Sequence, residues 1–298
     1  MSRIATIGFF DGVHKGHCYL FEHLQSVAKE RGLEPLIITF AEHPRTALQA
    51  DYMPQLLTTL DERKELLRAY GEVLVLPFAD IQPLTAAEFM QVLHDQYGVS
   101  VLLMGYDHRF GSDRLKHPHE YRHIGEKCGI EVLTMSEFTD GEWHVSSTEI
   151  RSALETGNIA MANELLGRPY SLSGRVVHGN GIGRSIGFPT ANIQPDSAEK
   201  IIPKTGVYAV EVSGLEVSGL AVSGLAIRGI CNIGTNPTIG NTQETIEVYI
   251  PDFEGDLYGQ HMDIRFTRFI REEKHFDSLS ELREQITRDV DSSLHPGV

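Results

Sequence analysis

The first residues suited to chemistry form a short stretch near the N-terminus, Gly8-Phe9-Phe10-Asp11-Gly12-Val13-His14-Lys15-Gly16-His17. It joins an apolar run to a helical segment, and such turns in α/β folds bind phosphates through free backbone N–H groups and the helix dipole. Gly12 and Gly16 let the backbone approach a ligand closely. His14 and His17 can converge and stabilise charge on phosphate oxygens during attack at an α-phosphate. An isolated histidine pair is, however, more often a surface or capping pair.

A second glycine-containing stretch runs from Gly179 to Asn192. It is not a Walker A loop, because no Gly-Lys-Ser/Thr closes it. It is not a dinucleotide fingerprint either, since its spacing is Gly-x-Gly-x-x-x-Gly and Pro189 blocks the helix that would have to follow. Composition alone therefore favours a glycine-rich β-turn.

Two further patterns have a structural interpretation of their own. Ser146-x-x-Glu149 can form a capping box at a helix start, which is the favoured interpretation of the bare pattern. Glu247 lies on an alternating strand, on the face opposite Ile246 and Val248. By itself such a residue is a solvated strand carboxylate.

The elements that must position the N-terminal residues alternate between strands and helices, which predicts a Rossmann-like α/β domain with a parallel, doubly wound sheet. Short apolar runs are expected to form strands at Ile4–Phe10, Pro35–Phe40, Val73–Pro77, Val99–Met104 and Ile130–Met135. Amphipathic segments predict helices at Tyr19–Arg31, Thr59–Ala69, Ala86–Tyr97, His119–Cys128 and Ser147–Leu166.

The C-terminal part changes to glycine-punctuated strands, which predict a small antiparallel β-barrel. The expected strands are Leu172–Val177, Gly206–Val212, Ile227–Ile233, Thr245–Ile250 and Met262–Phe269. Leu279–Val290 is expected to be a terminal helix packed on the barrel. A tandem Val-Ser-Gly-Leu repeat at 212–225 is interpreted as a hairpin or loop extension without chemistry. The predicted domains are 1–168 and 169–298.

Composition limits the classes of function. The 298 residues suit two domains, and a formal net charge of -15 argues against non-specific nucleic-acid binding. Three scattered cysteines suggest neither a disulfide framework nor a zinc site, and a reducing cytoplasm fits them best. There is no signal peptide and no apolar stretch of membrane-spanning length. We therefore expect a cytoplasmic protein that binds small molecules, with no membrane, nucleic-acid or obligate protein partner.

The Asp-Gly-Val-His-x-Gly-His string resembles the signature of bacterial bifunctional riboflavin kinase/FAD synthetases. Thr39–Pro44, Gly105–Gly111 and Val145–Arg151 agree with that family in order and spacing, and so does Gly187-Phe188-Pro189-Thr190-Ala191-Asn192. Gly229–Thr238 and Thr245–Phe253 also match, so the resemblance extends over nearly the whole chain. It implies phosphorylation of riboflavin to FMN by residues 169–298 and adenylylation of FMN to FAD, with release of pyrophosphate, by residues 1–168.

The resemblance also implies roles for individual residues. ATP is the co-substrate of both reactions, and riboflavin, FMN and FAD are substrates or products. Catalytic roles fall to His14, His17, Arg151 and Glu247, the last as general base. ATP-binding roles fall to Gly8, Phe9, Asp11, Gly12, Gly16, Ser146, Ser147, Thr148, Gly179, Gly181, Gly183, Gly187, Thr190 and Asn192. Flavin-binding roles fall to Phe40, His43, Pro44, Asp107, Arg109 and Phe110. Thr190 and Asn192 would also hold Mg²⁺, which prefers oxygen ligands.

The chain departs from the family pattern at Ala41 and Glu42, where Asp-Pro is usual, at His108, where Phe is usual, and at Tyr249, where many relatives have His. The first three bear on flavin affinity. Two alternatives stay open: a nucleotidyltransferase for another substrate, such as pantetheine phosphate or nicotinate mononucleotide, and a flavin-binding sensor that has lost catalysis. Retention of His14, His17 and Glu247 argues against the sensor.

Overall fold

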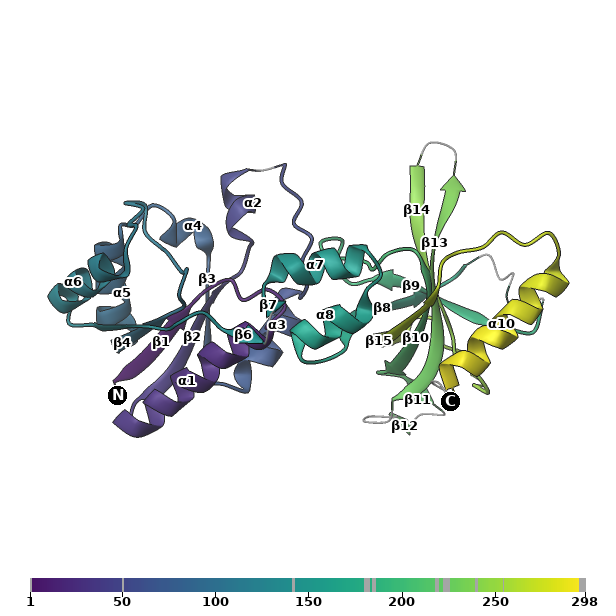
Figure 1. Cartoon of the computed structure of the whole chain (residues 1–298), viewed down its shortest axis with the longest axis horizontal. Helices are drawn as coiled ribbons and strands as arrows, with labels where there is room; N and C mark the ends of the chain where they lie inside the picture. The colour runs from purple at the N-terminus through teal and green to yellow at the C-terminus, as the bar shows by residue number, and fades with distance from the viewer. Residues whose placement is uncertain are drawn as a thin grey trace. The chain divides into compact units, whose positions relative to one another are not determined.

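A computed structural model describes residues 2–49, 51–140, 143–179, 183, 186–217, 220–221, 226–238, 241–253 and 255–294 (Figure 1). The chain divides into two compact units, Met1–Ser147 and Thr148–Val298. This division comes earlier than the expected boundary at 168, so the helical stretch before that boundary goes with the second unit. The ranges 1–168 and 169–298 stay a prediction about which residues each activity needs.

The first unit is built on a parallel five-stranded sheet of order β3-β2-β1-β4-β5. Its strands are β1 Arg3–Ile7, β2 Glu34–Phe40, β3 Glu72–Leu76, β4 Val99–Met104 and β5 Glu131–Thr134. Its helices are α1 Lys15–Arg31, α2 Pro44–Leu48, α3 Leu60–Arg68, α4 Phe78–Ile81, α5 Ala86–Tyr97 and α6 Pro118–Cys128, and β6 Thr139–Asp140 pairs with β7 Trp143–His144. The chain leaves β1 toward β2 on one side and returns at β4 on the other, so the carboxyl end of β1 is the switch point where such sheets bind ligands.

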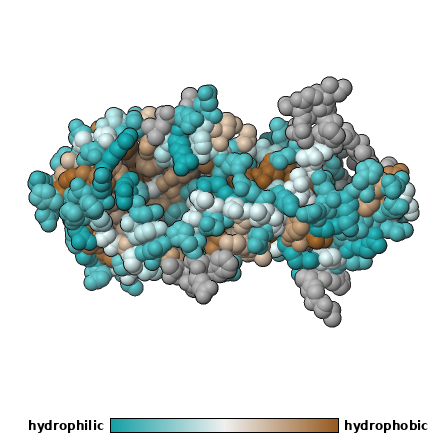
Figure 2. All heavy atoms as spheres, turned by 45° about the horizontal axis from the view of Figure 1, so that its top comes forward, coloured by the Kyte–Doolittle hydropathy of each residue, from teal (hydrophilic) through white to brown (hydrophobic). Residues whose placement is uncertain are grey.

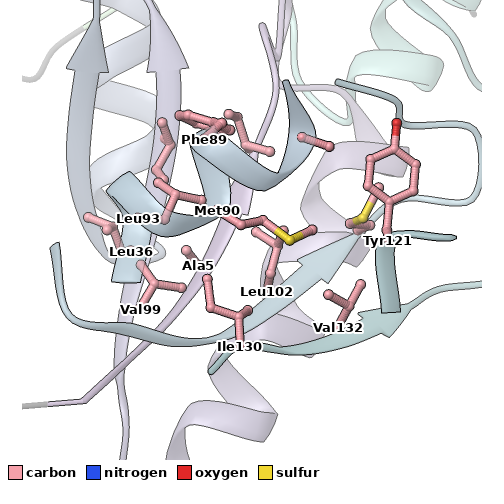
Figure 3. Packing of buried hydrophobic residues seen from close by; sticks show 14 of the residues in the cluster. Ala5, Leu36, Phe89, Met90, Leu93, Val99, Leu102, Tyr121, Ile130 and Val132 are labelled. Atoms are coloured by element: carbon pink, nitrogen blue, oxygen red, sulfur yellow. The ribbon is translucent and has the colours of Figure 1, made fainter. Parts of the chain in front are cut away.

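Both faces of this sheet are buried, because successive side chains of a strand point to opposite faces. On one face, Ala5 and Leu36 pack with helices α5 and α6. Figure 3 shows Phe89, Met90 and Leu93 of α5 lying against Val99 and Leu102 of β4. On the other face, a separate cluster joins Ile4, Ile37 and Val101 to the buried residues of α1. The doubly wound α/β prediction is therefore confirmed.

Helix ends in this unit follow from local sequence. Thr59 and Thr85 begin α3 and α5 as capping boxes with Glu62 and Glu88. Gly98 ends α5 in the left-handed conformation, at a φ of 67°. The short helices α2 and α4 were not expected, since four or five residues carry too little periodicity to be recognised.

The second unit contains a closed six-stranded antiparallel barrel of order β10-β13-β14-β9-β8-β15. Its strands are β8 Tyr170–Val177, β9 Thr190–Pro195, β10 Gly206–Ser213, β13 Ile227–Thr238, β14 Asn241–Tyr249 and β15 His261–Arg271. Its helices are α7 Ser147–Glu155, α8 Ile159–Leu166 and α10 Leu279–Leu294. The barrel and its terminal helix are as predicted, although β9 was missed.

Side-chain contacts attach α8 to the barrel. Asn163 donates from Nδ2 to the carbonyl of Phe266 at 2.9 Å and accepts from the backbone N–H of Tyr170 at 2.7 Å. Within the Val-Ser-Gly-Leu repeat, β11 Glu216–Val217 pairs with β12 Leu220–Ala221 as a hairpin. Residues 218, 219 and 222–225 of that repeat lie outside the described residues.

One face of the molecule can be described by the hydropathy of its residues. On the face drawn in Figure 2, hydrophilic residues predominate and hydrophobic ones form scattered patches. The most exposed large apolar side chains are Met53 and Leu279, at 68% and 59%. In the described part of the chain, no helix combines the length and the apolar character needed to cross a membrane.

Candidate active sites

The turn between β1 and α1 holds the predicted N-terminal site residues in a tightly constrained backbone. Phe10, Gly12 and Val13 all have positive φ, at 54°, 82° and 42°. A Cβ at Gly8 would lie 2.6 Å from the ring of Phe10, and one at Gly16 would lie 3.3 Å from the ring of His14. A side chain at Gly8 would therefore displace Phe10, and one at Gly16 would crowd His14, at the edge of the sheet where a ligand is expected.

The two histidines of the turn are stacked on each other. Their ring centroids are 3.6 Å apart with an interplanar angle of 17°, and His14 is 6% exposed. His14 also caps α1, because its Nδ1 accepts from the backbone N–H of His17 at 3.4 Å. The capping interpretation is therefore correct for His14, and two imidazoles lie side by side at a helix N-terminus, while their catalytic role stays a prediction.

Asp11 anchors the turn to the segment before α3. Its carboxylate accepts from the backbone N–H groups of Leu57 and Thr58, each at 3.0 Å, and from the hydroxyl of Thr58. Ser147 donates its hydroxyl to the carbonyl of Asp11 at 2.9 Å. Asp11 is 3% exposed, so it is a buried support of the turn, and a direct contact with ATP stays a prediction.

The remaining N-terminal ATP residues are distributed along the chain. Phe9 is half-buried beside the turn, with its carbonyl held by the hydroxyl of Thr39 at 3.0 Å. Ser146 directly precedes α7, whereas Thr148 and Arg151 lie on that helix within the second unit. The part of these three residues in phosphate binding stays a prediction.

The expected flavin residues fall into two groups in the structure. His43 caps α2, with Pro44 in the first turn, and its ring meets that of Phe9 edge to face at 4.8 Å. Phe40 is 6% exposed at the end of β2. Phe110 instead packs against Phe89 and Tyr121 at the helical face of the sheet, while Asp107 and Arg109 are exposed. In the structure, His43 therefore lies beside the turn, whereas Phe110 packs against the hydrophobic core.

His108, one of the family departures, has an unusual environment. Its Nε2 is shielded from solvent and has no hydrogen-bond partner among the described residues. Burial lowers the pKa of this imidazole to about 4, against the opposing charge of Asp107. His108 is therefore neutral at neutral pH and behaves as a mainly apolar ring, as a phenylalanine would.

The C-terminal candidates meet on adjacent barrel strands. Register places Asn192 of β9 opposite Glu247 of β14, and Asn232 of β13 opposite Glu247 on the other side. The hydroxyl of Thr190 donates to Glu247 Oε2 at 3.0 Å. Strands β9 and β14 therefore bring a hydroxyl, an amide and a carboxylate together at one place.

Three of these residues, Thr190, Asn232 and Glu247, line a cavity of about 280 Å³ inside the second unit, together with Tyr249. Its apolar lining comes from Ile186, Phe188, Val207, Ile230, Phe276, Leu282 and Ile286. Charged side chains also line it, namely Arg271, Glu273, Lys274 and Asp289. Glu247 is thus a half-buried carboxylate within a cavity, which the strand pattern alone does not distinguish from a solvated one.

The glycine segment before β9 approaches the same residues. A Cβ at Gly179 would lie 2.1 Å from Asn192 Nδ2, and one at Gly183 would lie 2.3 Å from the carbonyl of Phe188. Gly187 has a φ of 88°, and Gly181 lies outside the described residues. Close approach therefore explains the first two of these glycines, and a left-handed turn explains Gly187.

Sequence reasoning missed one pair in the cavity wall, Arg271 of β15 and Asp289 of α10. Arg271 donates from Nε and from Nη2 to the Asp289 carboxylate, at 3.0 Å and 2.8 Å. Asp289 is 3% exposed. The two residues are 18 positions apart on different elements, and an arginine and an aspartate at that spacing give no sequence signal.

Comparison with known proteins identifies both halves of the chain. The family model described as FAD synthetase matches residues 1–149, and the one described as riboflavin kinase matches residues 166–295. A bifunctional riboflavin kinase/FMN adenylyltransferase of Escherichia coli (strain K12) is 39% identical over 290 residues, which cover 96% of this chain and 90% of that protein. The chain belongs to the bifunctional riboflavin kinase/FMN adenylyltransferase family.

Two other relatives extend this result. The enzyme of the same name from Haemophilus influenzae is 35% identical over 292 residues, covering 97% of this chain and 92% of its own. A crystal structure titled as a macrolide-efflux protein from Streptococcus pneumoniae superposes with a TM-score of 0.88 at 32% identity, covering 99% of this chain and 94% of its own. The name macrolide-efflux protein refers to the Streptococcus protein alone. The structure of that protein has the same fold as this chain.

Proposed function

We propose that the two activities of this riboflavin kinase and FMN adenylyltransferase reside in the two sites described above. The cavity of the second unit phosphorylates riboflavin, and the β1–α1 turn serves the adenylylation of FMN. The hydrogen bond between Thr190 and Glu247 inside the cavity carries the first assignment, because it places a carboxylate and a hydroxyl at one point of an otherwise largely apolar pocket.

In the kinase reaction, Glu247 acts as the general base. Its carboxylate takes the proton of the ribityl 5'-hydroxyl while that oxygen bonds to the γ-phosphorus of ATP and the bond to the ADP oxygen breaks. The apolar wall receives the isoalloxazine ring. Tyr249 adds a second polar group to the wall and meets Phe188 edge to face at 5.2 Å, so an aromatic pair borders the place of reaction.

Thr190 and Asn192 are the residues that would hold Mg²⁺ in this site. A hydroxyl and an amide oxygen suit a hard cation that keeps water and phosphate oxygens in its shell. In the described residues, no cluster of three or more histidine, cysteine or acidic side chains is arranged to hold a metal, and such a cluster is not needed for Mg²⁺ bound mainly through ATP. Bound Mg²⁺ would neutralise charge on the transferred phosphate.

In the adenylyltransferase reaction, an oxygen of the FMN phosphate attacks the α-phosphorus of ATP, and pyrophosphate leaves. The stacked imidazoles of His14 and His17 donate hydrogen bonds to the oxygens on which charge develops. Backbone N–H groups of the turn and the N-terminus of α1 bind the remaining phosphate oxygens. His43 lies on the flavin side. Because both reactions consume ATP, we place the enzyme in the cytoplasm.

One incubation tests both assignments. Purified protein with riboflavin, ATP and Mg²⁺ should form FMN and then FAD, resolved by chromatography over time. The H17A variant should accumulate FMN without FAD, whereas E247A should leave riboflavin unconverted yet still make FAD from supplied FMN. FAD formation at the wild-type rate by H17A, or FMN formation at that rate by E247A, would contradict the corresponding site. No conversion by the wild-type protein would favour a sensor.

A further inference from the structure

The first unit contains a buried cation that none of the assignments above uses. Arg63 lies in the first turns of α3 and is 1% exposed, and it is among the largest fully buried side chains of the chain. Burial lowers its pKa to about 10, against the nearby charge of Asp11. The guanidinium is therefore still protonated at neutral pH, so a full positive charge lies inside the domain.

Its hydrogen bonds are incomplete. Nη2 donates to the carbonyl of Phe40 at 2.6 Å, but Nε and Nη1 are buried with no hydrogen-bond partner in the described part of the chain. No residue there forms an ion pair with Arg63 either. Buried donors are almost always satisfied in folded proteins, so two open donors on one cation require an explanation.

The position of Arg63 indicates what the missing acceptor is. Phe40 ends β2, and the ring of Phe9, just after β1, lies over the guanidinium with 4.1 Å between its centroid and Cζ. Both residues lie at the carboxyl edge of the sheet, where doubly wound folds bind their ligands. Phe9 is half-buried and covers one face of the guanidinium at this edge of the sheet.

The charge and the open donors of Arg63 favour an anion as the missing acceptor. The acidic side chain that acts on Arg63, Asp11, directs its carboxylate oxygens to the N–H groups of Leu57 and Thr58. Arginine presents planar donors that match phosphate oxygens, and such charge-assisted bonds are stronger than neutral ones. We propose that Nε and Nη1 of Arg63 bind a phosphate group of a substrate in the adenylyltransferase site.

The phosphate can belong to FMN or to ATP, and kinetics distinguish the two. FAD formation from FMN and ATP is measured in R63M and R63K while each substrate is varied in turn. R63M keeps the apolar stem without the charge, and R63K keeps the charge without the planar donors. The matched control is R68M on the exposed side of the same helix. Riboflavin phosphorylation by the same chain reports folding of the second unit, and thermal unfolding of each variant reports folding of the first.

We expect R63M to raise the KM for one phosphate substrate at least tenfold, R63K to recover part of this loss, and R68M to behave as wild type. A higher KM for FMN assigns its monophosphate, and a higher KM for ATP, together with weaker inhibition by pyrophosphate, assigns the triphosphate. The proposal is overturned if both KM values stay within threefold of wild type, or if kcat alone falls.

A second measurement covers the case in which R63M does not fold. In wild-type protein labelled with ¹⁵N-arginine, the slowly exchanging Nε–H signal of the buried arginine should shift on titration with pyrophosphate alone or with FMN alone. No shift with either compound contradicts the proposal. This inference rests on the proposed adenylyltransferase site, but different variants test the two. If the proposed site is wrong, H17A makes FAD normally. If only the role of Arg63 is wrong, R63M makes FAD normally and H17A does not.

Discussion

The hydroxyl of Thr190 and the carboxylate of Glu247 are joined across strands β9 and β14 by a 3.0 Å hydrogen bond, although 57 residues separate them in the chain. This bond orients Glu247 Oε2 within the cavity. It also places the hydroxyl where it can exchange its carboxylate partner for a cation and a phosphate. A direct hydrogen bond therefore joins the proposed general base, Glu247, to the proposed Mg²⁺ ligand, Thr190.

Replacing Thr190 by valine should reduce riboflavin phosphorylation about a hundredfold, because it removes the hydroxyl without changing the side-chain shape and leaves Glu247 less well oriented. Initial rates of FMN formation at saturating riboflavin measure this. FAD formation from FMN should be unchanged, and T287V, on an exposed part of α10, should change neither rate. Full kinase activity in T190V would remove Thr190 from the mechanism.

Gly179→Ala should raise the KM of the kinase for ATP about tenfold. Its Cβ would lie 2.1 Å from Asn192 Nδ2 and displace that side chain. Gly187→Ala is the contrasting variant, since nothing lies within 4 Å of its Cβ and its cost of about 1–2 kcal/mol comes from the positive φ. G187A should lower stability more than ATP affinity, and equal KM values for both variants would contradict this account.

Asp289→Asn should destabilise the second unit by about 3–5 kcal/mol, because it leaves the largely buried guanidinium of Arg271 without its charge partner. Urea unfolding followed by loss of kinase activity measures the effect. D291N, on an exposed position of α10, is the control. The double variant R271M/D289L should recover much of the stability, since it removes both charges together, and no recovery would show that the pair does more than hold α10.

The neutral state of His108 predicts a pH dependence of stability. Its pKa is about 4 when folded against 6.5 for the free side chain, so the unfolded state binds the extra proton as pH falls from 6.5 toward 4. The stabilisation that neutral His108 contributes is fully present above pH 6.5. It is lost as the pH falls from 6.5 to 4, by at most about 3 kcal/mol. H108F should lose less stability than wild type between pH 7.5 and pH 5 in urea titrations, and parallel losses would contradict the assignment.

Local patterns predicted those parts of the fold that depend on neighbouring residues. The histidines of the turn were expected to converge because they are three residues apart beside a helix start, and they do. The alternation around Glu247 correctly separated the buried Ile246 and Val248 from the face that lines the cavity. The strand-helix alternation predicted a parallel, doubly wound sheet, but it did not predict the strand order β3-β2-β1-β4-β5.

What could not be predicted depends on pairing across long stretches of chain. Strand β9 was missed because it follows Pro189 in a segment that reads as a glycine-rich turn. The bond from Thr190 to Glu247 and the Arg271–Asp289 pair depend on barrel register and helix docking. The burial of Arg63 gave no sequence signal, because periodicity places charged residues in solvent and cannot indicate that the first turns of α3 face the sheet edge.

The closed barrel has no free strand edges, whereas the open sheet of the first unit ends on β3 and β5. Unpaired edges are templates for intermolecular strand addition and aggregation. Each of these two edge strands begins with an exposed glutamate, and each glutamate is paired with an arginine: Glu72 with Arg3 at 2.8 Å, and Glu131 with Arg31 at 2.5 Å. Charged side chains on both edge strands oppose edge-to-edge pairing with another copy of the sheet, a protection that the closed barrel does not need.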